Sequence, residues 1–198
     1  MSEQIIAYPL ENNLYLSITD RCTLVCEFCP KTKGSLKIGD FDLSMDHRPS
    51  AEEIIASIHH PENYNEVVFC GYGESTLRLK VLKDVAKWLK QRNIKIRLNT
   101  DGLGNLVNKR NILPELKGLI DTVSVSMNAQ NEEVYIQHCQ PQLEGSYQAM
   151  LDFLKDAPNY IPRVIASAIN GLDGVDIDAC RSIAENLGVE FRQREYFD

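Results

Sequence analysis

The chain has 198 residues, of which 43% are hydrophobic and 25% are charged, and its net charge is -7 at neutral pH. This composition is typical of a globular protein, and the length suits a single domain over residues 1–198. The negative charge argues against non-specific binding to nucleic acid or to anionic membranes. No stretch approaches about 20 consecutive apolar residues, and the N-terminus lacks the features of a secretory signal, so we expect a cytoplasmic protein with no membrane partner.

Strand-like and helical segments alternate along the chain. Ser50 with Glu53 predicts a capping box at the start of a helix, and Gly188 predicts the end of the last helix. We expect strands at 14–19, 66–70, 94–100, 122–127, 163–169 and 189–192, and helical segments at 50–59, 77–91, 106–116, 147–154 and 176–187. Strands that alternate with helices, without an internal repeat, predict an α/β fold with right-handed crossovers and a parallel sheet.

Polar and apolar residues alternate in several predicted strands, although fully buried parallel strands are usually apolar throughout. In segment 94–99, for example, Ile, Ile and Leu alternate with Lys, Arg and Asn. If the apolar set packs against the helices, the polar set faces a hydrated or ligand-filled interior. We therefore expect a partial (β/α)6 parallel barrel that is laterally open. The alternative is an antiparallel sheet with one wet face, which the alternation of helices and strands disfavours.

Three of the six cysteines lie directly after the first predicted strand. Cys22, Cys26 and Cys29 have C-x3-C-x2-C spacing, which indicates a metal centre. Four cysteines would complete a zinc tetrahedron or a cubane, whereas three leave one coordination position open. The alternative is a zinc site with His47 or Cys70 as fourth ligand, and the lack of a second ligand pair disfavours it. The remaining cysteines, Cys70, Cys139 and Cys180, are far apart, and we expect free thiols.

Two further motifs follow the second and third predicted strands. Residues 71–74 read Gly-Tyr-Gly-Glu, and residues 99–102 read Asn-Thr-Asp-Gly. Together with the cysteine spacing, these motifs resemble those of the radical S-adenosylmethionine (SAM) superfamily. In that superfamily three cysteines hold a [4Fe-4S] cluster whose fourth iron chelates SAM, and reduction cleaves SAM to a 5′-deoxyadenosyl radical. Blocks 66–74, 95–102 and 191–196 resemble the small TatD-associated radical SAM proteins.

The resemblance implies a set of cofactor-binding residues. Cys22, Cys26 and Cys29 are the implied cluster ligands. Phe28 occupies the position where the family commonly places an aromatic residue against the adenine. Tyr72 and Asp101 stand where the family more often has glycine and asparagine. The implied SAM contacts are Phe28, Gly71, Tyr72, Gly73, Glu74, Asn99, Thr100, Asp101, Ser126 and Asn128, with Ser167 and Asn170 as weaker candidates.

The function implied by the resemblance is that of an oxygen-sensitive radical SAM enzyme that abstracts hydrogen from an unidentified substrate. Its implied partners are a low-potential electron donor of the flavodoxin or ferredoxin type and a TatD-type hydrolase. One alternative is a non-catalytic iron-sulfur or zinc-binding protein. A second alternative is an adaptor that binds SAM without cleaving it.

Four basic residues line the predicted interior by strand parity: Lys95, Arg97, Arg192 and Arg194. Clustered guanidinium groups suit carboxylate or phosphate, which predicts an anionic substrate. Pairing with Glu66 or Glu190 inside the protein is the equally supported alternative. Cys139 or Cys70 is a further candidate, as a thiol hydrogen donor near the radical, although most lone cysteines are inert.

Overall fold

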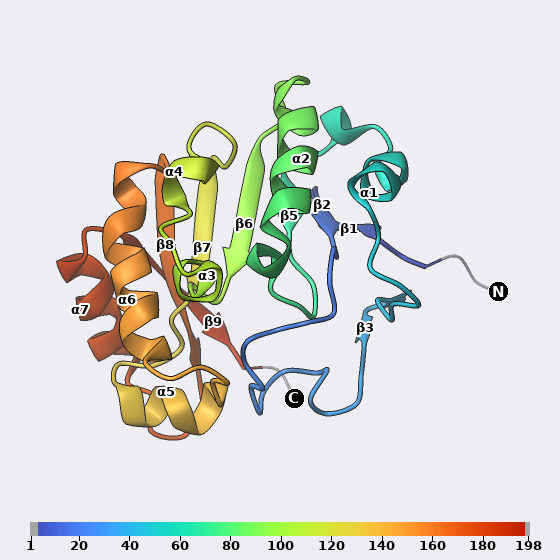
Figure 1. Cartoon of the computed structure of the whole chain (residues 1–198). Helices are drawn as coiled ribbons and strands as arrows, with labels where there is room; N and C mark the ends of the chain where they lie inside the picture. Colours follow the sequence, from blue (N-terminus) through green and yellow to red (C-terminus); the bar gives the residue numbers. More distant parts are fainter. Residues whose placement is uncertain (1–3, 197–198) are drawn as a thin grey trace.

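The computed structural model describes residues 4–196 and contains a seven-stranded sheet of order β1-β2-β5-β6-β7-β8-β9 (Figure 1). Every neighbouring pair from β2 to β9 is parallel. The sheet is open, with β1 and β9 at its edges, so the predicted α/β partial barrel is confirmed. The parallel strands are β2 (Asn13–Leu16), β5 (Val67–Phe69), β6 (Ile96–Thr100), β7 (Thr122–Ser126), β8 (Arg163–Asn170) and β9 (Glu190–Glu195).

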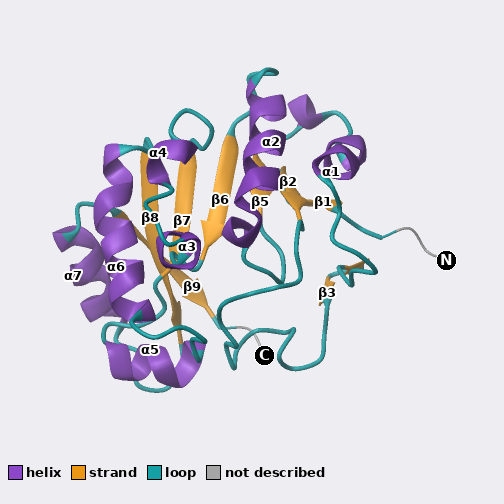
Figure 2. Ribbon diagram, viewed as in Figure 1, coloured by secondary structure: helices purple, strands orange, loops and turns teal. Residues whose placement is uncertain are grey.

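The helices lie in the connections between the parallel strands, and Figure 2 shows α2, α4 and α6 over one face of the sheet. The α-helices are α1 (Ala51–Ser57), α2 (Leu79–Lys90), α3 (Gly104–Asn108), α4 (Leu113–Leu116), α5 (Glu132–Cys139), α6 (Ser146–Asp156) and α7 (Ile177–Asn186). Short 3-10 helices are η1 (Pro61–Asn63), η2 (Ser75–Arg78) and η3 (Ala157–Asn159). Within residues 4–196, no helix has both the length and the apolar character needed to cross a membrane.

Strand register separates an apolar face from a polar one, as the alternation predicts. Leu16, Phe69, Leu98 and Val123 lie at equivalent or adjoining register positions and are fully buried in the core with the helices. The apolar stripe of α2, from Leu79 to Leu89, is buried in the same core. Since successive side chains of a strand point to opposite faces, the polar residues between these positions face the other side of the sheet.

Helix ends follow the local signals in the sequence. Ser50 and Glu53 form the expected capping box of α1. Gly188 takes a positive φ of 71° just after α7, as a C′ glycine does. The helix expected over 106–116 is instead divided into α3 and α4, because Lys109 adopts a left-handed conformation with a φ of 53°.

Two strand pairs were not predicted. β1 (Ala7–Leu10) runs antiparallel to β2, and β3 (Lys37–Ile38) pairs with β4 (Phe41–Asp42) in a separate hairpin. β1 is short and contains Pro9, which an edge strand tolerates because its N–H side needs no partner. Aromatic contacts hold both additions in place: the buried Tyr8 ring of β1 stacks on Tyr15 of β2 and also meets Phe41 of the hairpin, with ring centroids 5.6 Å apart in each case.

Candidate functional site

The cysteine loop, residues 22–29, follows the carboxyl end of β2. Cys22 is exposed, Cys26 and Cys29 are half-buried, and all three are free thiols. The backbone N–H of Cys29 donates to the Cys26 carbonyl at 3.1 Å, which curls the loop. The loop therefore presents three sulfurs at the edge of the sheet where parallel α/β proteins place their reactive groups.

The end of α5 and the residues after it anchor the cysteine loop. Val25 N–H donates to the Cys139 carbonyl at 3.2 Å, and Glu27 N–H donates to the His138 carbonyl at 3.0 Å. The buried His138 ring also contacts Glu27 Oε1 through Nδ1 at 2.5 Å and the Asp173 carbonyl through Nε2 at 2.6 Å. This anchor was not identified from the sequence, because no local signal predicts a contact across 111 residues.

The three thiols lie within electrostatic range of one another. Although Cys22 is exposed as a residue, partial burial of its thiol, with Asp101 as the next contribution, raises its pKa to about 12, and Cys29 also adds to the rise. A hydrogen bond to Cys139 is the main cause that raises the pKa of Cys26, followed by burial and by the charges of Cys139, Cys22 and Cys29. Iron binds the thiolate form and displaces these protons. Three free thiols that act on one another from one loop are the donor set that a cluster with an open fourth position requires.

The described residues offer no ready site for a single metal ion. Over residues 4–196, no three His, Cys, Asp or Glu side chains are gathered as ligands of one ion. Of the two candidate fourth ligands for zinc, His47 contacts Glu53 at 2.7 Å, and Cys70 lies against Asn99. An iron-sulfur cubane differs from a single ion because each cysteine binds a separate iron.

Two buried polar atoms lack a protein partner, one on α5 beside the loop and one at the end of β6. The hydroxyl of Tyr135 on α5 is fully buried without a hydrogen bond, and the charges of Cys139, Asp101, Cys26 and Cys22 contribute to raising its pKa after burial itself. Asn99 Oδ1, at the end of β6, is also buried and unpaired. Because unpaired buried polar groups are costly, these atoms point to a bound group at this site. Tyr135 was not predicted, since nothing in its local sequence distinguishes it from a core tyrosine.

Gly71 and Gly73 allow the segment after β5 to approach the start of the cysteine loop. A Cβ on Gly73 would lie 2.2 Å from the Thr19 carbonyl oxygen and 2.7 Å from that of Arg21. A Cβ on Gly71 would lie 2.4 Å from Ser17 Oγ. Neither position tolerates a side chain without movement, so these glycines bring the β5 turn and the start of the cysteine loop into direct contact.

Glu74 and Asp101 are buried carboxylates that join the ends of β5 and β6. Glu74 accepts hydrogen bonds from Thr76 N–H at 2.8 Å, the Thr100 hydroxyl at 2.9 Å and Asp101 N–H at 2.8 Å. Asp101 accepts from the Thr23 hydroxyl and from Leu103 N–H. Burial and the neighbouring Glu74 raise the pKa of Asp101. The predicted residues Glu74, Thr100 and Asp101 thus form one network that reaches the cysteine loop through Thr23.

The two predicted aromatic contacts lie on or beside the loop. Phe28 is half-buried and packs against the core, while the Tyr72 hydroxyl donates to the Lys37 carbonyl at 2.7 Å. Burial raises the pKa of Tyr72, and the charge of Cys29 contributes next. Tyr72 therefore stands within electrostatic range of the third cysteine and contacts the β3–β4 hairpin.

The later predicted residues lie at the ends of β7 and β8. Ser126 is half-buried, and Asn128 is buried with its Nδ2 3.5 Å from Cys139 Sγ. The weaker candidates have protein partners: the Ser167 hydroxyl donates to the Val125 carbonyl at 3.3 Å, and Asn170 donates to Glu195 at 2.9 Å. Asn128 thus borders the cysteine loop through Cys139, whereas Asn170 is at the exposed edge.

The four basic residues predicted to line the interior behave differently. Lys95 is exposed and precedes β6, so it does not belong to the central row. Arg97 is buried and pairs with Glu66 at 2.9 Å, as the alternative interpretation expects. Arg192 donates to Ser124 Oγ at 3.2 Å, and Arg194 donates to Asn128 Oδ1 at 2.6 Å. Glu190 pairs with Arg163 instead of either of them.

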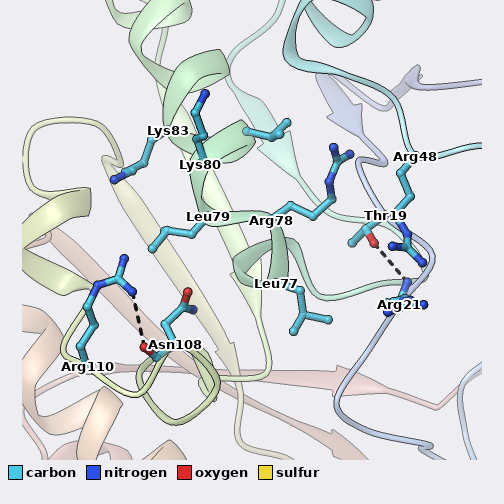
Figure 3. Close-up of a pocket in the computed structure, with 11 residues that line it drawn as sticks. Thr19, Arg21, Arg48, Leu77, Arg78, Leu79, Lys80, Lys83, Asn108 and Arg110 are labelled. Carbon is cyan, nitrogen blue, oxygen red and sulfur yellow. Dashed lines mark hydrogen bonds between the residues drawn. The ribbon is translucent and has the colours of Figure 1, made fainter.

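A basic cavity of about 550 Å³ opens beside the start of the cysteine loop (Figure 3). Arg21, which precedes Cys22, lines it together with residues from the first turns of α2. Its six basic lining residues are Arg21, Arg48, Arg78, Lys80, Lys83 and Arg110. Among the described residues, no acidic one lines this cavity, although the chain as a whole is negatively charged.

The fold is similar to those of several solved structures. TYW1 with a lysine-pyruvate adduct bound superposes with a TM-score of 0.65 and 12% identity, over 94% of this chain and 65% of that chain. Streptococcus suis SuiB bound to S-adenosylmethionine gives 0.66 and 12%, over 94% and 41%. Methylornithine synthase (PylB) gives 0.56 and 13%, over 93% and 53%. The chain thus spans less than two thirds of the length of each of these structures.

The family comparison covers most of the chain, although no curated protein matches it. Residues 16–187 match the family described as the Radical SAM superfamily. This span contains the cysteine loop and the turns after β5 and β6, where the site residues converge. The chain therefore belongs to the radical SAM superfamily of enzymes.

Proposed function

We propose that Cys22, Cys26 and Cys29 hold a [4Fe-4S] cluster, and that the chain binds S-adenosylmethionine beside it. When bound, the cluster and SAM supply reductive cleavage to a 5′-deoxyadenosyl radical, which abstracts hydrogen from a substrate. The observation that carries the proposal is a loop with three free thiols that act on one another electrostatically, beside the unpaired Tyr135 hydroxyl. We expect the substrate to carry an anionic group.

Different residues would position the cysteine loop, contact the cofactor and exclude water from the site. The α5 anchor and the Glu74–Asp101 network hold the cysteine loop from two sides. Gly71 and Gly73 let the β5 turn approach that loop, where backbone groups can bind the cofactor. Phe28 and Tyr72 add aromatic surface, and the buried α5 residues Tyr135 and Cys139 exclude water from the inner side of the loop.

Anaerobic reconstitution tests this proposal directly. We expect about four irons per chain, the brown colour of an iron-sulfur protein, and 5′-deoxyadenosine on addition of SAM and dithionite. Cys22→Ala, Cys26→Ala and Cys29→Ala should each lose iron, and Cys180→Ala, a buried thiol on α7, is the matched control.

Two results would contradict the enzyme. Colourless protein with one tightly held zinc would favour the metal-binding alternative, and SAM binding without 5′-deoxyadenosine would favour the adaptor.

We also propose that a low-potential donor of the flavodoxin or ferredoxin type docks at the basic cavity. Five acidic neighbours partly neutralise its six basic residues. Asp20 pairs with Arg48, Asp84 with Lys80, and Glu115 with Lys83 and Arg110, while Glu53 and Glu52 act at longer range on Arg78 and Lys80. A positive surplus remains next to Arg21 and hence next to Cys22. Complementary charge accelerates encounter with an acidic partner, and this effect weakens with salt.

Charge removal tests the docking surface. In Arg48→Gln/Lys80→Gln, we expect flavodoxin-driven formation of 5′-deoxyadenosine to fall at least about 5-fold more than dithionite-driven formation, with a weaker salt dependence. Lys87→Gln, in the last turn of α2 and outside the cavity, is the control. Equal losses with both reductants would contradict docking at this surface.

A TatD-type hydrolase as partner and a cytoplasmic location stay predictions from the sequence. Co-purification of the tagged chain from its native cells, with identification of the recovered proteins, tests the first. Fractionation of the same cells tests the second.

A further inference from the structure

Arg192 and Arg194 stand on one face of β9, at the open edge of the sheet. Residues two apart on a strand point to the same side, about 6.5 Å from each other. In the sheet register Arg192 lies opposite Ser167, which lies opposite Ser126, and Arg194 lies opposite Ile169. The two guanidinium groups reach inward, since Arg192 contacts Ser124 on β7 and Arg194 contacts Asn128 just after it.

These two arginines differ from the neighbouring arginines because neither has a carboxylate as an ion-pair partner among the described residues. Arg97 pairs with Glu66 at 2.9 Å, and Arg163 pairs with Glu190 at 2.7 Å. Among the residues that the structure describes, Arg192 and Arg194 form no ion pair, and each has only a neutral side-chain oxygen as acceptor. Arg194 Nε is buried with no hydrogen-bond partner in this part of the chain.

Electrostatics make this pair unfavourable in the free protein. Burial lowers the pKa of Arg194, and the charge of Arg192 lowers it further. Burial lowers the pKa of Arg192, and Arg97 is the next cause. Arg192 is exposed and Arg194 is half-buried, so water screens part of the repulsion between them, and a bound anion would relieve the rest.

The site also lies beside the proposed cluster. Asn128 accepts from Arg194 through Oδ1, and its Nδ2 lies 3.5 Å from Cys139 Sγ. The backbone of Cys139 in turn holds Val25 of the cysteine loop. One asparagine therefore separates the guanidinium of Arg194 from the anchor of the loop.

We propose that Arg192 and Arg194 bind an oxyanion group of the substrate, either a carboxylate or a phosphate, at the open edge of the sheet. This proposal rests on the proposed function, because only an enzyme has a substrate. Binding of an anion by the two arginines does not require the cluster and can be tested separately. Planar guanidinium forks suit the oxygens of both groups, and Ser126 lies in the same register row as a hydroxyl donor.

Titration of the cluster-free protein tests the anion site without any reaction. The probes are inorganic phosphate and glutarate, followed by isothermal titration calorimetry at low ionic strength in chloride buffer. We expect saturable binding of at least one probe, and the stronger one distinguishes phosphate from carboxylate. Arg192→Gln and Arg194→Gln should each weaken it at least about 10-fold, and Arg192→Lys should restore part of the loss.

Arg163→Gln is the matched control, because Arg163 belongs to the same sheet and is exposed like Arg192, but it is paired with Glu190. We expect its probe affinity to stay within about 2-fold of that of the unmodified chain. If Arg163→Gln lost as much probe affinity as Arg192→Gln, the loss would be an effect of net charge, and the proposed anion site would be wrong. Absence of saturable binding by both probes would overturn it as well.

A second titration separates the substrate anion from the carboxylate of SAM. With reconstituted protein, the affinity for SAM should be the same in Arg192→Gln as in the unmodified chain. A parallel loss of SAM affinity would assign the arginines to SAM and overturn the proposal. Failure of the proposed function gives a different pattern, in which anion binding persists but no 5′-deoxyadenosine forms.

Discussion

The charged residues at the carboxyl ends of β5 and β6 differ from those on β9 in the partners that surround them. At β5 and β6 the buried carboxylates of Glu74 and Asp101 receive hydrogen bonds from five protein donors. At β9 the guanidiniums of Arg192 and Arg194 have neutral acceptors and, within residues 4–196, no carboxylate. Buried carboxylates that receive several hydrogen bonds can hold neighbouring strand ends together, whereas the exposed Arg192 and the half-buried Arg194 are left without a counter-ion. The first region thus joins the strand ends beside the cysteine loop, and the second is the proposed anion site.

Removal of Glu74 should have the largest effect. Glu74→Ala leaves the N–H groups of Thr76 and Asp101 and the Thr100 hydroxyl without their acceptor, so we expect a loss of about 3 kcal/mol or more in the free energy of unfolding. Urea denaturation measures it. The exposed Glu144→Ala is the control, with a change within about 0.5 kcal/mol. Similar values for both variants would contradict the supporting role of the first region.

Replacement of Gly73 by alanine should destabilise the protein more than the same replacement of Gly71. In Gly73→Ala the new Cβ meets two backbone carbonyls, so the β5 turn must move and we expect a loss of about 1–3 kcal/mol with reduced iron content after reconstitution. Gly71→Ala is the internal comparison, because its nearest contact is the Ser17 hydroxyl, which can rotate. Denaturation and iron analysis measure both variants. A larger effect at Gly71 than at Gly73 would contradict the close approach of the β5 turn to the backbone before the cysteine loop.

Removal of the unpaired Tyr135 hydroxyl should change both the stability of the protein and the reduction potential of the cluster. Tyr135→Phe removes a buried group without a partner, so the cluster-free protein should gain about 1 kcal/mol in stability. If the hydroxyl donates to the cluster or its thiolates, the same change should lower the cluster's reduction potential by roughly tens of millivolts. A redox titration followed by electron paramagnetic resonance measures the potential. Tyr147→Phe, whose ring lies 5.5 Å from that of Tyr135, is the control.

Removal of a β9 charge should have the smallest effect on stability, with a sign opposite to that of Glu74→Ala. Arg192→Gln relieves repulsion among Arg192, Arg194 and Arg97, but water screens the exposed Arg192, so we expect a gain of no more than about 0.5 kcal/mol in the free energy of unfolding. Arg163→Gln, which loses an exposed ion pair, should cost between about 0 and 1 kcal/mol. Thermal and urea unfolding in chloride buffer measure both. A clear loss in Arg192→Gln would mean that this arginine stabilises the fold.

Much of the fold was predictable because its signals are local. The six parallel strands and the apolar stripe of α2 follow from the periodicity of the sequence, and the ends of α1 and α7 follow from Ser50 and Gly188. β1 and the β3–β4 hairpin were missed because they are short and depend on contacts such as Tyr8 on Tyr15. The division of the helix at Lys109 is a backbone feature that composition does not indicate.

The candidate site was predictable only in part. The cysteine spacing and the turns after β5 and β6 predicted Cys22, Cys26, Cys29, Gly73 and Glu74 as site residues from patterns of residues close together in the chain. Tyr135 and the His138–Glu27 contact were not identified, because their importance depends on α5 folding back on the cysteine loop.

The sequence by itself determined the class of fold and the presence of three clustered thiols, because periodicity and spacing are properties of neighbouring residues. Only the tertiary structure decided which charges are neutralised. Strand parity predicted that Arg97, Arg192 and Arg194 all line the interior. In the structure Arg97 pairs with Glu66, while the two arginines of β9 have no carboxylate partner in the described chain. The physical reason is that an ion pair depends on distance in space, and the order of residues along a strand specifies the face of a side chain but not the residue opposite it.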